Sequence, residues 1–257
     1  MTESDVQLVQ SLSRGLAVIR AFDGTRPRQT LAQVAEVTGL PRATTRRFLH
    51  TLVAEGFART DGTVFWLTPK TLELGYSYLS SLGLPAIAQP HLEALSHKLN
   101  ESCSTSVLDG TDVVYVARAA ANRIMSVNIT IGTRFPAHAT SMGRMLLSGL
   151  SEQELDAYLD GVTLKHLTPR TITNKHELQA AILKAAEQGY CIVDEELELG
   201  LRSVACPVTN AHGEVVAAVN VSAHAAAYSL DQLRDTLLPP LKETADAISS
   251  DIITTKK

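Results

Sequence analysis

The chain has 257 residues, of which 45% are hydrophobic and 19% charged, and its formal net charge at pH 7 is -4. This length allows one large domain or two modest ones, each with its own core. No basic leader with an apolar segment and no run of about 18 apolar residues occurs, so we expect neither export nor membrane insertion. The three cysteines lack metal-site spacing and suit a reducing cytosol. We therefore expect a cytoplasmic, globular protein without a bound metal or cofactor.

Basic side chains are concentrated in the first 80 residues, which hold nine lysines and arginines against seven acids in a chain that is acidic overall. Apolar residues recur there at helical spacing from Leu12 to Phe22, and a second short helix is expected between Thr30 and Gly39. Thr30 and Gln33 have the spacing of a reciprocal capping box, and Gly39 can close the helix. The basic surplus therefore falls on a segment that predicts a small helical domain.

A third helix is expected to begin at Pro41, after a short turn. Its apolar residues follow the spacing i, i+3, i+4, i+7 and form a stripe that is expected to be buried, namely Thr45, Phe48, Leu49 and Leu52. The Asp61-Gly62 pair within an alternating segment then predicts a tight hairpin. Two short helices, a tight turn and a hairpin predict a winged helix-turn-helix domain over residues 1–68.

The face of this third helix opposite the apolar stripe is basic. Arginine side chains can contact guanine edges or phosphates in a major groove, while small residues let the helix approach closely. The residues that we expect to contact DNA are Arg42, Ala43, Thr44, Arg46, Arg47 and His50 on the helix and Arg59 on the hairpin. The alternative is a solvated face that is charged for solubility. It is strongest for Arg59, which suits a phosphate contact better than a base contact.

The rest of the chain predicts a linker and a second domain. Residues 69–100 are expected to form a helical linker and dimerisation region, with Leu72 pointing inward. From residue 101 short strands predominate, including a predicted strand over 123–132, and a last helix is expected to be interrupted at Pro239-Pro240. The helices of this part are expected to begin near Ser141, Ser151, Asn174 and Ser229. A largely antiparallel sheet with helices on one side predicts an α+β domain over 101–257.

Catalytic motifs are missing from the sequence, which contains no nucleophile elbow, zinc-protease helix or phosphate-binding glycine loop. We therefore expect no catalytic residue, although an enzyme of small organic acids with a DNA-binding appendage stays open. The stretch RFPAHATSMGR suggests an anion site instead, because a helix beginning near Ser141 offers free backbone N–H groups close to Arg134 and His138. The alternatives are a capping role for Ser141, a packed polar shell for His138, and ion pairs between Arg134 and the acids at 194–198.

Polar residues also interrupt an apolar strand near the end of the chain. Asn220 and Ser222 share one face of that strand, so they are expected either in solvent or against a polar cavity. Ser203, on a neighbouring predicted strand, has the same two interpretations. We favour the cavity for Asn220 and Ser222.

Over essentially its whole length the chain resembles the IclR-type bacterial transcriptional regulators. The resemblance rests on three parts together: TLAQVAEVTGLPRATTRRFLHTLVAEGF, GTRFPAHATSMGRMLL, and DEELELGLRSVACPV followed by GEVVAAVNVS. Within the family, SLSRGLAVIRAFD, YVARAAANRIMSVNITIGTRFPAHATSMGR and LTPRTIT are most similar to one branch. That branch controls β-ketoadipate pathway genes for the catabolism of protocatechuate and 4-hydroxybenzoate.

The resemblance implies a GAF-like effector domain that binds a small aromatic or dicarboxylic acid between its sheet and the helix that begins at Ser141. The family's pocket positions correspond here to Ile124, Val127, Ser141, Met142, Val193, Ser203, Asn220 and Ser222. Relatives that bind small keto acids have an acidic residue and a cysteine where this chain has Val193 and Ser203. The resemblance therefore implies a larger, partly apolar acid.

The partners implied are double-stranded operator DNA and a second copy of the chain, in a homodimer or a dimer of dimers, with RNA polymerase as a further partner. Dimerisation also has a physical reason, because one short helix covers only a few base pairs and a pair of helices reads two half-sites. Two further functions stay open: an IclR-type regulator of another carboxylic-acid pathway, and a nucleotide-sensing GAF-type module.

Overall fold

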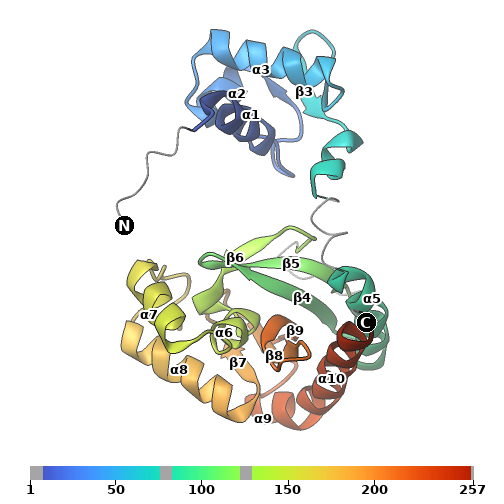
Figure 1. The fold of residues 1–257 in the computed structure, drawn as a ribbon, viewed down its shortest axis with the longest axis vertical. Helices are drawn as coiled ribbons and strands as arrows, with labels where there is room; N and C mark the ends of the chain where they lie inside the picture. Colours follow the sequence, from blue (N-terminus) through green and yellow to red (C-terminus); the bar gives the residue numbers. More distant parts are fainter. Residues whose placement is uncertain (1–7, 76–82, 122–128, 256–257) are drawn as a thin grey trace. The chain divides into compact units, whose positions relative to one another are not determined.

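The computed structural model describes residues 8–75, 83–121 and 129–255. The chain divides into two compact units, residues 1–81 and 82–257, each with its own hydrophobic core (Figure 1). Within the described ranges, no helix has both the length and the apolar composition that crossing a membrane requires.

The first unit combines three helices with a small antiparallel sheet. The helices are α1 (Gln10–Arg20), α2 (Leu31–Thr38) and α3 (Arg42–Ala54), and the strands, in the order β1-β3-β2, are β1 (Gln29–Thr30), β3 (Val64–Leu67) and β2 (Ala58–Thr60). The core in which they meet contains Val18, Ala21, Val34, Leu49 and Phe65. This is the winged helix-turn-helix arrangement that the sequence predicts, with β2 and β3 as the wing.

Local signals set the ends of α2 and α3. Thr30 and Gln33 form the predicted reciprocal capping box, and Gly39 ends α2 in the left-handed conformation at a φ of +67°. Pro41 differs from the prediction because it is the N-cap of α3, where its carbonyl accepts a hydrogen bond from the backbone N–H of Thr45 at 2.9 Å. The helix therefore begins one residue later than the sequence pattern predicts.

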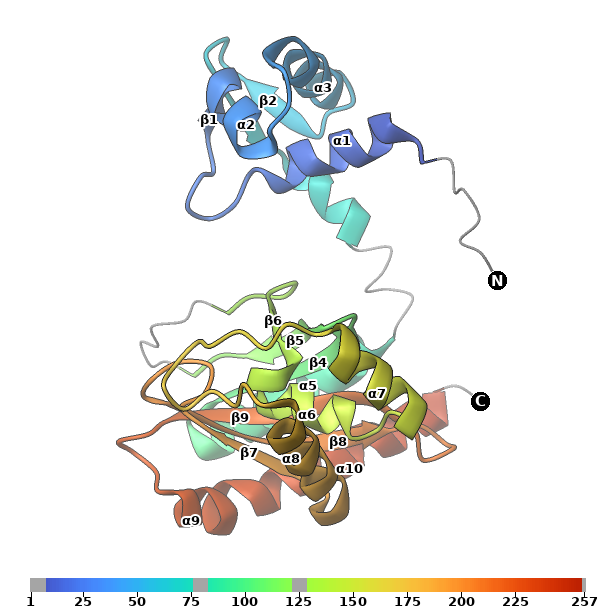
Figure 2. The same cartoon turned by 90° about the vertical axis from the view of Figure 1, so that its left-hand side faces the viewer.

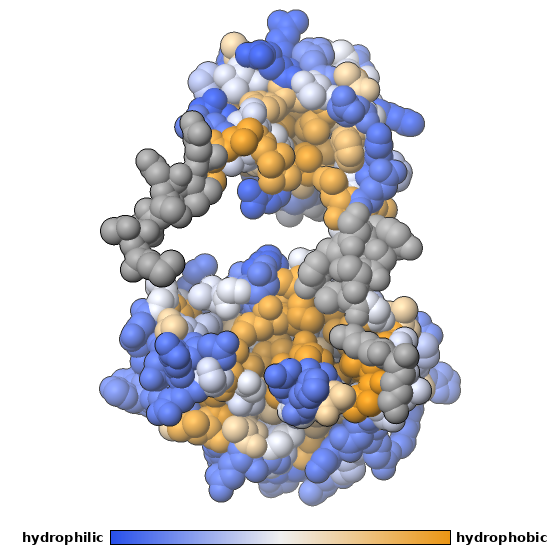
Figure 3. All heavy atoms as spheres, viewed as in Figure 1, coloured by the Kyte–Doolittle hydropathy of each residue, from blue (hydrophilic) through white to orange (hydrophobic). Residues whose placement is uncertain are grey.

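Several apolar side chains of the first unit are exposed. Leu12 and Leu16, on the apolar stripe of α1, are 64% and 43% exposed, and Figure 3 shows apolar surface over the part of the unit where α1 lies. Leu72, in the helical turn that follows η1 (Pro69–Thr71), is 74% exposed, so the prediction that it points inward is wrong for this unit. The continuation of that predicted linker helix over residues 76–82 lies outside the described residues.

The second unit is a six-stranded antiparallel sheet between two layers of helices (Figures 1 and 2). In the order β6-β5-β4-β9-β8-β7, the strands are β6 (Arg134–Pro136), β5 (Asp112–Ala119), β4 (Ser102–Asp109), β9 (Val215–His224), β8 (Leu201–Thr209) and β7 (Cys191–Asp194). One layer contains α5 (Leu84–Leu99) and α10 (Leu238–Thr255), and the other contains α6 (Ser141–Leu147), α7 (Glu152–Gly161) and α8 (Lys175–Gln188).

The prediction of helices on one side of the sheet is therefore wrong, although the α+β class is confirmed. Every residue of β4 from Ser102 to Val107 is buried, as is every residue of β9 from Ala217 to Ala223. Because successive side chains of a strand point to opposite faces, such continuous burial requires a cover on both faces.

The structure also corrects two expected elements. Of the predicted strand over 123–132, residues 123–128 lie outside the described residues and residues 129–132 form a loop, while the edge strand β6 begins at Arg134. The terminal helix is not interrupted at Pro239-Pro240, because both prolines lie in the first turn of α10, where a missing N–H costs little. The irregularity lies just before them, as a π-helical turn over Leu233–Leu237 that follows the short α9 (Leu230–Gln232).

Helix α5 belongs to the second unit. Its residues Leu84, Ala88, Leu92 and Leu95 are buried where it packs against α10, β4 and β5, and the boundary between the units falls after Ser81. The segment 69–100, which the sequence predicts as a separate helical linker, is thus divided between the two units.

Candidate DNA-binding face and effector site

The outer face of α3 is accessible and basic. The exposed residues on it are Arg42, Ala43, Arg46, Arg47 and His50, and Thr44 is half-buried. Leu49, which is fully buried, and Thr45 anchor the opposite side of the helix in the core. Within the described residues, the three arginines of this face form no ion pair. Their guanidinium groups are therefore available to phosphates or base edges.

The wing adds further cations to the first unit. Arg59 is exposed on β2, directly opposite Trp66 of β3. The guanidinium of Arg28, just before β1, lies 4.1 Å from the centre of the Trp66 ring, a cation–π contact that orients it. Sequence reasoning missed Arg28 because nothing in its local pattern shows that β1 pairs with β3.

Polar side chains form rows across one face of the larger sheet. Ser102 pairs with Ser222, Ser222 with Ser203, and Ser203 with Val193. Residues directly opposite one another on paired strands point to the same face, so these four side chains lie in one row. The next row, two residues along each strand, contains Ser104 paired with Asn220. Three predicted effector residues therefore share a row, and a fourth lies in the neighbouring row.

Helix α6 covers this polar face. The hydroxyl of Ser106, two residues beyond Ser104 on β4, contacts the Sδ of Met142 at 3.3 Å. Met142 and Ser141 have no exposed surface, and Val193 is 3% exposed. Met142 of α6 thus contacts the face of the sheet that carries Ser203, Asn220 and Ser222, with Val193 at the end of their row.

Two buried polar atoms of this face lack a hydrogen-bond partner among the described residues. Asn220 and Ser222 are 3% and 5% exposed, which excludes the alternative of solvent exposure. The amide nitrogen of Asn220 donates to the Ser222 hydroxyl at 3.1 Å, but Asn220 Oδ1 and Ser141 Oγ have no partner. An unsatisfied buried polar atom costs about 1–3 kcal/mol. Both atoms therefore have hydrogen-bonding capacity that the described residues leave unused.

At the start of α6, the structure corrects which residue caps the helix. Thr140 is the N-cap and its hydroxyl accepts from the backbone N–H of Gly143 at 3.0 Å, so Ser141 has no capping role. Gly143 also permits close packing of the preceding turn, because a Cβ there would lie 2.1 Å from the carbonyl oxygen of Ala137. The helix has only seven residues, and the hydroxyl of its own N-cap already occupies the N–H of Gly143.

A buried ion pair fixes α6 to the loop after β7. Arg144 and Glu196 form two hydrogen bonds, at 2.7 Å and 2.5 Å, with side chains only 4% and 9% exposed. Arg144 Nε also donates to the carbonyl of His138 at 2.9 Å, and the backbone N–H of Ile172 donates to Glu196 Oε2 at 3.0 Å. Sequence reasoning assigned no role to this pair, because 52 residues separate its members.

Arg134 lies away from the polar rows and has partners of its own. Its guanidinium is 2.6 Å from Asp109 and 3.2 Å from Asp112, at the hairpin end of β4 and β5. Ser102 lies at the opposite end of β4. Asp194, Glu195 and Glu196 pair instead with other arginines, namely Arg144, Arg170 and Arg202. Among the described residues, Arg134 therefore pairs with Asp109 and Asp112 and not with the acids at 194–198.

His138 is completely buried beneath the segment around Lys165. Its Nε2 lies 3.2 Å from the Lys165 carbonyl oxygen, and its Nδ1 has no partner among the described residues. This matches the interpretation of His138 as part of a packed polar shell. Ile124 and Val127, the two remaining predicted effector residues, lie outside the described residues.

Burial of His138 predicts a loss of stability in acid. Burial lowers the pKa of its imidazole in the folded state below the ordinary value of about 6.5. The unfolded chain then binds the proton first, so stability is retained above about pH 6.5 and falls as the pH drops toward the folded-state pKa. We expect His138→Gln to lose less unfolding free energy than the parent between pH 7.5 and pH 5.5 in urea titrations. Equal losses in the two proteins would contradict this role of His138.

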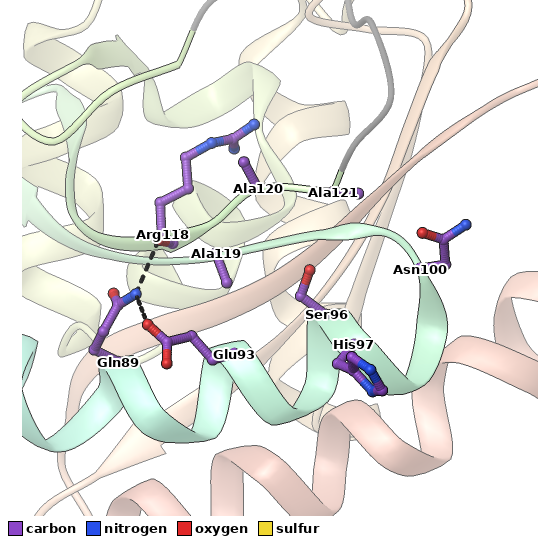
Figure 4. A pocket seen from close by; sticks show the side chains of 9 residues that line it. All are labelled: Gln89, Glu93, Ser96, His97, Asn100, Arg118, Ala119, Ala120 and Ala121. Atoms are coloured by element: carbon purple, nitrogen blue, oxygen red, sulfur yellow. Dashed lines mark hydrogen bonds between the residues drawn. The ribbon is translucent and has the colours of Figure 1, made fainter.

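A cavity of about 570 Å³ lies elsewhere in the second unit, between α5 and the end of β5 (Figure 4). It is lined by Gln89, Glu93, Ser96, His97, Asn100 and residues 118–121. Gln89 donates to the Arg118 carbonyl at 3.2 Å and to Glu93 at 2.7 Å. Figure 4 shows the Arg118 side chain pointing away from α5, whereas Ala119 points toward it. Arg118 is a polar residue of the opposite face that sequence reasoning missed.

The winged unit with an exposed basic helix, joined to a unit with a covered polar face, defines a two-domain DNA-binding regulator. Residues 11–62 match the IclR helix-turn-helix domain, and residues 76–250 match the C-terminal domain of the bacterial transcriptional regulator IclR. The chain belongs to the IclR family of bacterial transcriptional regulators.

Three proteins similar to this chain are regulators, and two of them are of known structure. The chain is 44% identical to the Pca regulon regulatory protein of Pseudomonas putida over 92% of its own length and 82% of the relative's. A crystal structure of a transcriptional regulator from Rhodococcus sp. RHA1 is 58% identical, with a TM-score of 0.88 and coverage of 97% of this chain and 100% of that one. A double mutant of the PobR inducer-binding domain from Acinetobacter, in complex with 3-hydroxybenzoic acid, is 36% identical with a TM-score of 0.61, covering 64% and 97% respectively.

Proposed function

We propose that this protein regulates transcription of aromatic-acid catabolic genes and that a small aromatic or dicarboxylic acid, bound in its second unit, alters its binding to operator DNA. The observation that carries the proposal is the exposed arginine face of α3 in a chain 44% identical to the Pca regulon regulatory protein. The exposed residues Arg42, Ala43, Arg46, Arg47, His50 and Arg59, with Thr44, form the DNA-binding surface. The protein acts by binding, in the cytoplasm where its operator lies, and not by catalysis.

The proposed effector site lies between the sheet and α6. It comprises Ser141, Met142, Val193, Ser203, Asn220 and Ser222, with Ile124 and Val127 from the segment outside the described residues. The support is the pair of unsatisfied buried atoms, Asn220 Oδ1 and Ser141 Oγ. A bound acid can shift the protein only through different affinities for two conformations, and coupling of about 1–3 kcal/mol is typical.

We further propose a homodimer or a dimer of dimers that contacts RNA polymerase at its promoter. The support is the exposed apolar surface of the first unit, including Leu12, Leu16 and Leu72, which a second copy can bury. In the second unit, α5 packs directly on β4 and β5. The chain leads from the DNA-binding unit through residues 69–83 into α5. A displacement of the sheet on effector binding can therefore shift α5 and be transmitted along the chain to the DNA-binding unit.

Filling the proposed site should abolish the response to effector. We expect Asn220→Leu and Ser222→Leu to lose the rise in melting temperature that a bound acid gives the parent, because the leucine side chain occupies the space and removes polar contacts. Operator binding should be retained, since both residues lie in the second unit. Ser250→Leu, at an exposed position of α10, is the matched control. Full effector-induced stabilisation in both site variants would exclude this site.

A further inference from the structure

Arg118 lies at one end of a row that crosses the sheet of the second unit. The paired residues of this row, from β5 to β7, are Arg118, Ser104, Asn220, Ala205 and Cys191. Directly paired residues share a face, so Arg118 lies on the face that α6 covers, beside Ser104 and two strands from Asn220. With strands about 4.8 Å apart, the backbones of Arg118 and Asn220 are about 10 Å apart. One row therefore contains a guanidinium, a hydroxyl and an unsatisfied amide oxygen.

The charge of Arg118 has no counter-ion among the described residues. Its side chain is half-buried, and Nη1 donates to the Ser104 hydroxyl at 3.1 Å. Burial lowers the pKa of Arg118, and none of the described acids forms an ion pair with it. Other arginines of the same unit do have acids: Arg134 pairs with Asp109 and Asp112, and Arg144 with Glu196. Since partly buried charges are ordinarily paired, an anion that is not part of the described chain can serve as the counter-ion of the Arg118 guanidinium.

The far end of the row has a different chemistry. Ala205, Cys191 and the neighbouring Val193 are buried within the hydrophobic core of this unit. Between the cation and these apolar residues lies the unsatisfied Asn220 Oδ1, and Ser141 Oγ of the covering helix α6 is a second buried atom without a partner among the described residues. A ligand that reaches from Arg118 to Asn220 has one anionic end, a hydroxyl at its other end that donates a hydrogen bond, and a flat or apolar body that the adjoining core can contact.

We propose that Arg118 binds the carboxylate of the effector and thereby selects an aromatic monocarboxylate that carries a hydroxyl. The inference rests on the proposed function, because it assigns the anionic end of the same site. Asn220 Oδ1 and Ser141 Oγ accept from the hydroxyl group. Within the described part of this face, a dicarboxylate is disfavoured because Arg144 and Arg202, on the neighbouring α6 and β8, are already paired with Glu196 and Asp194.

The test compares three probes on the full-length protein by isothermal titration calorimetry: 4-hydroxybenzoate, 4-hydroxybenzyl alcohol, in which a neutral CH2OH group replaces the carboxylate, and adipate. We expect the parent to bind 4-hydroxybenzoate at least about tenfold more tightly than either other probe. Arg118→Met should weaken 4-hydroxybenzoate about 10- to 100-fold and change the alcohol less than about twofold. Arg134→Met is the matched control. It removes an arginine of the same sheet that already pairs with carboxylates of the chain, so the affinities for all three probes should stay unchanged.

The outcomes separate this inference from the proposed function. If the parent binds 4-hydroxybenzoate and Arg118→Met binds it equally well, the carboxylate anchor is wrong while the effector site stands. If adipate binds the parent as tightly as 4-hydroxybenzoate, the selection of a monocarboxylate is wrong. If the parent binds none of the probes, the proposed effector class fails and the inference fails with it. Should Arg118→Met not fold, Arg118→Gln and the comparison of the three probes on the parent still test whether Arg118 binds the carboxylate.

Discussion

Replacing both Arg46 and Arg47 by alanine should reduce operator affinity by at least about 30-fold, because each contact of this kind contributes about 1–3 kcal/mol. Both side chains are exposed on α3, and neither has an ion-pair partner among the described residues. Contacts to phosphate also release counterions, so the double variant should show a shallower dependence of affinity on salt concentration. The measurement is a fluorescence anisotropy titration of labelled operator DNA at several salt concentrations.

A loss of net positive charge alone could also weaken binding, and the control separates that effect. Arg234 is an exposed arginine of the second unit that pairs with Asp231. Arg234→Ala removes one of the two positive charges that the double variant loses without touching α3, so its operator affinity should stay within about twofold of the parent. Unchanged affinity in Arg46→Ala/Arg47→Ala would show that α3 is not the recognition helix.

Arg144→Met should produce the largest loss of stability, about 3–5 kcal/mol, because it leaves the buried carboxylate of Glu196 without its counter-ion. The variant also removes the donor to the His138 carbonyl. Urea unfolding followed by far-ultraviolet circular dichroism measures the effect. The single tryptophan, Trp66, lies in the first unit, so its fluorescence should report a transition close to that of the parent.

An exposed ion pair supplies the comparison for this stability effect. Arg234 and Asp231 are 46% and 85% exposed, and such surface pairs contribute about 1 kcal/mol or less. Arg234→Met should therefore shift the unfolding transition only slightly. A loss below about 1 kcal/mol in Arg144→Met would mean that the Arg144–Glu196 pair does not hold α6 in place.

The DNA-binding unit could be predicted closely because its signals are local. The capping box of Thr30 and Gln33, the left-handed Gly39 and the Asp61-Gly62 turn each act over a few residues. The spacing of Thr45 and Leu49 likewise follows from the helical repeat alone. Leu12 and Leu72 were predicted less well. The helical periodicity predicts that such side chains are buried, but it does not identify the surface that buries them, and both are exposed in this unit.

The sequence predicted the general fold of the effector unit but not its long-range contacts. Asn220 and Ser222 could be found because two polar residues on one face of an apolar strand are a local pattern. Arg118 could not, since its position beside Ser104 depends on how β4 and β5 pair, which includes a register shift near Thr105. The choice of Arg144 over Arg134 as the partner of Glu196 likewise depends on how the loop after β7 packs against α6.

The most direct test of acid-dependent DNA binding is fluorescence anisotropy of the purified protein on DNA from upstream of its own gene and of neighbouring catabolic genes. The titration is run with and without 4-hydroxybenzoate, protocatechuate and β-ketoadipate, at fixed salt. We predict sequence-specific, salt-sensitive binding whose affinity one of these acids changes by about 5- to 150-fold, the range of typical allosteric coupling. Specific binding that no acid alters would contradict the effector assignment, and no specific binding would contradict the regulator itself.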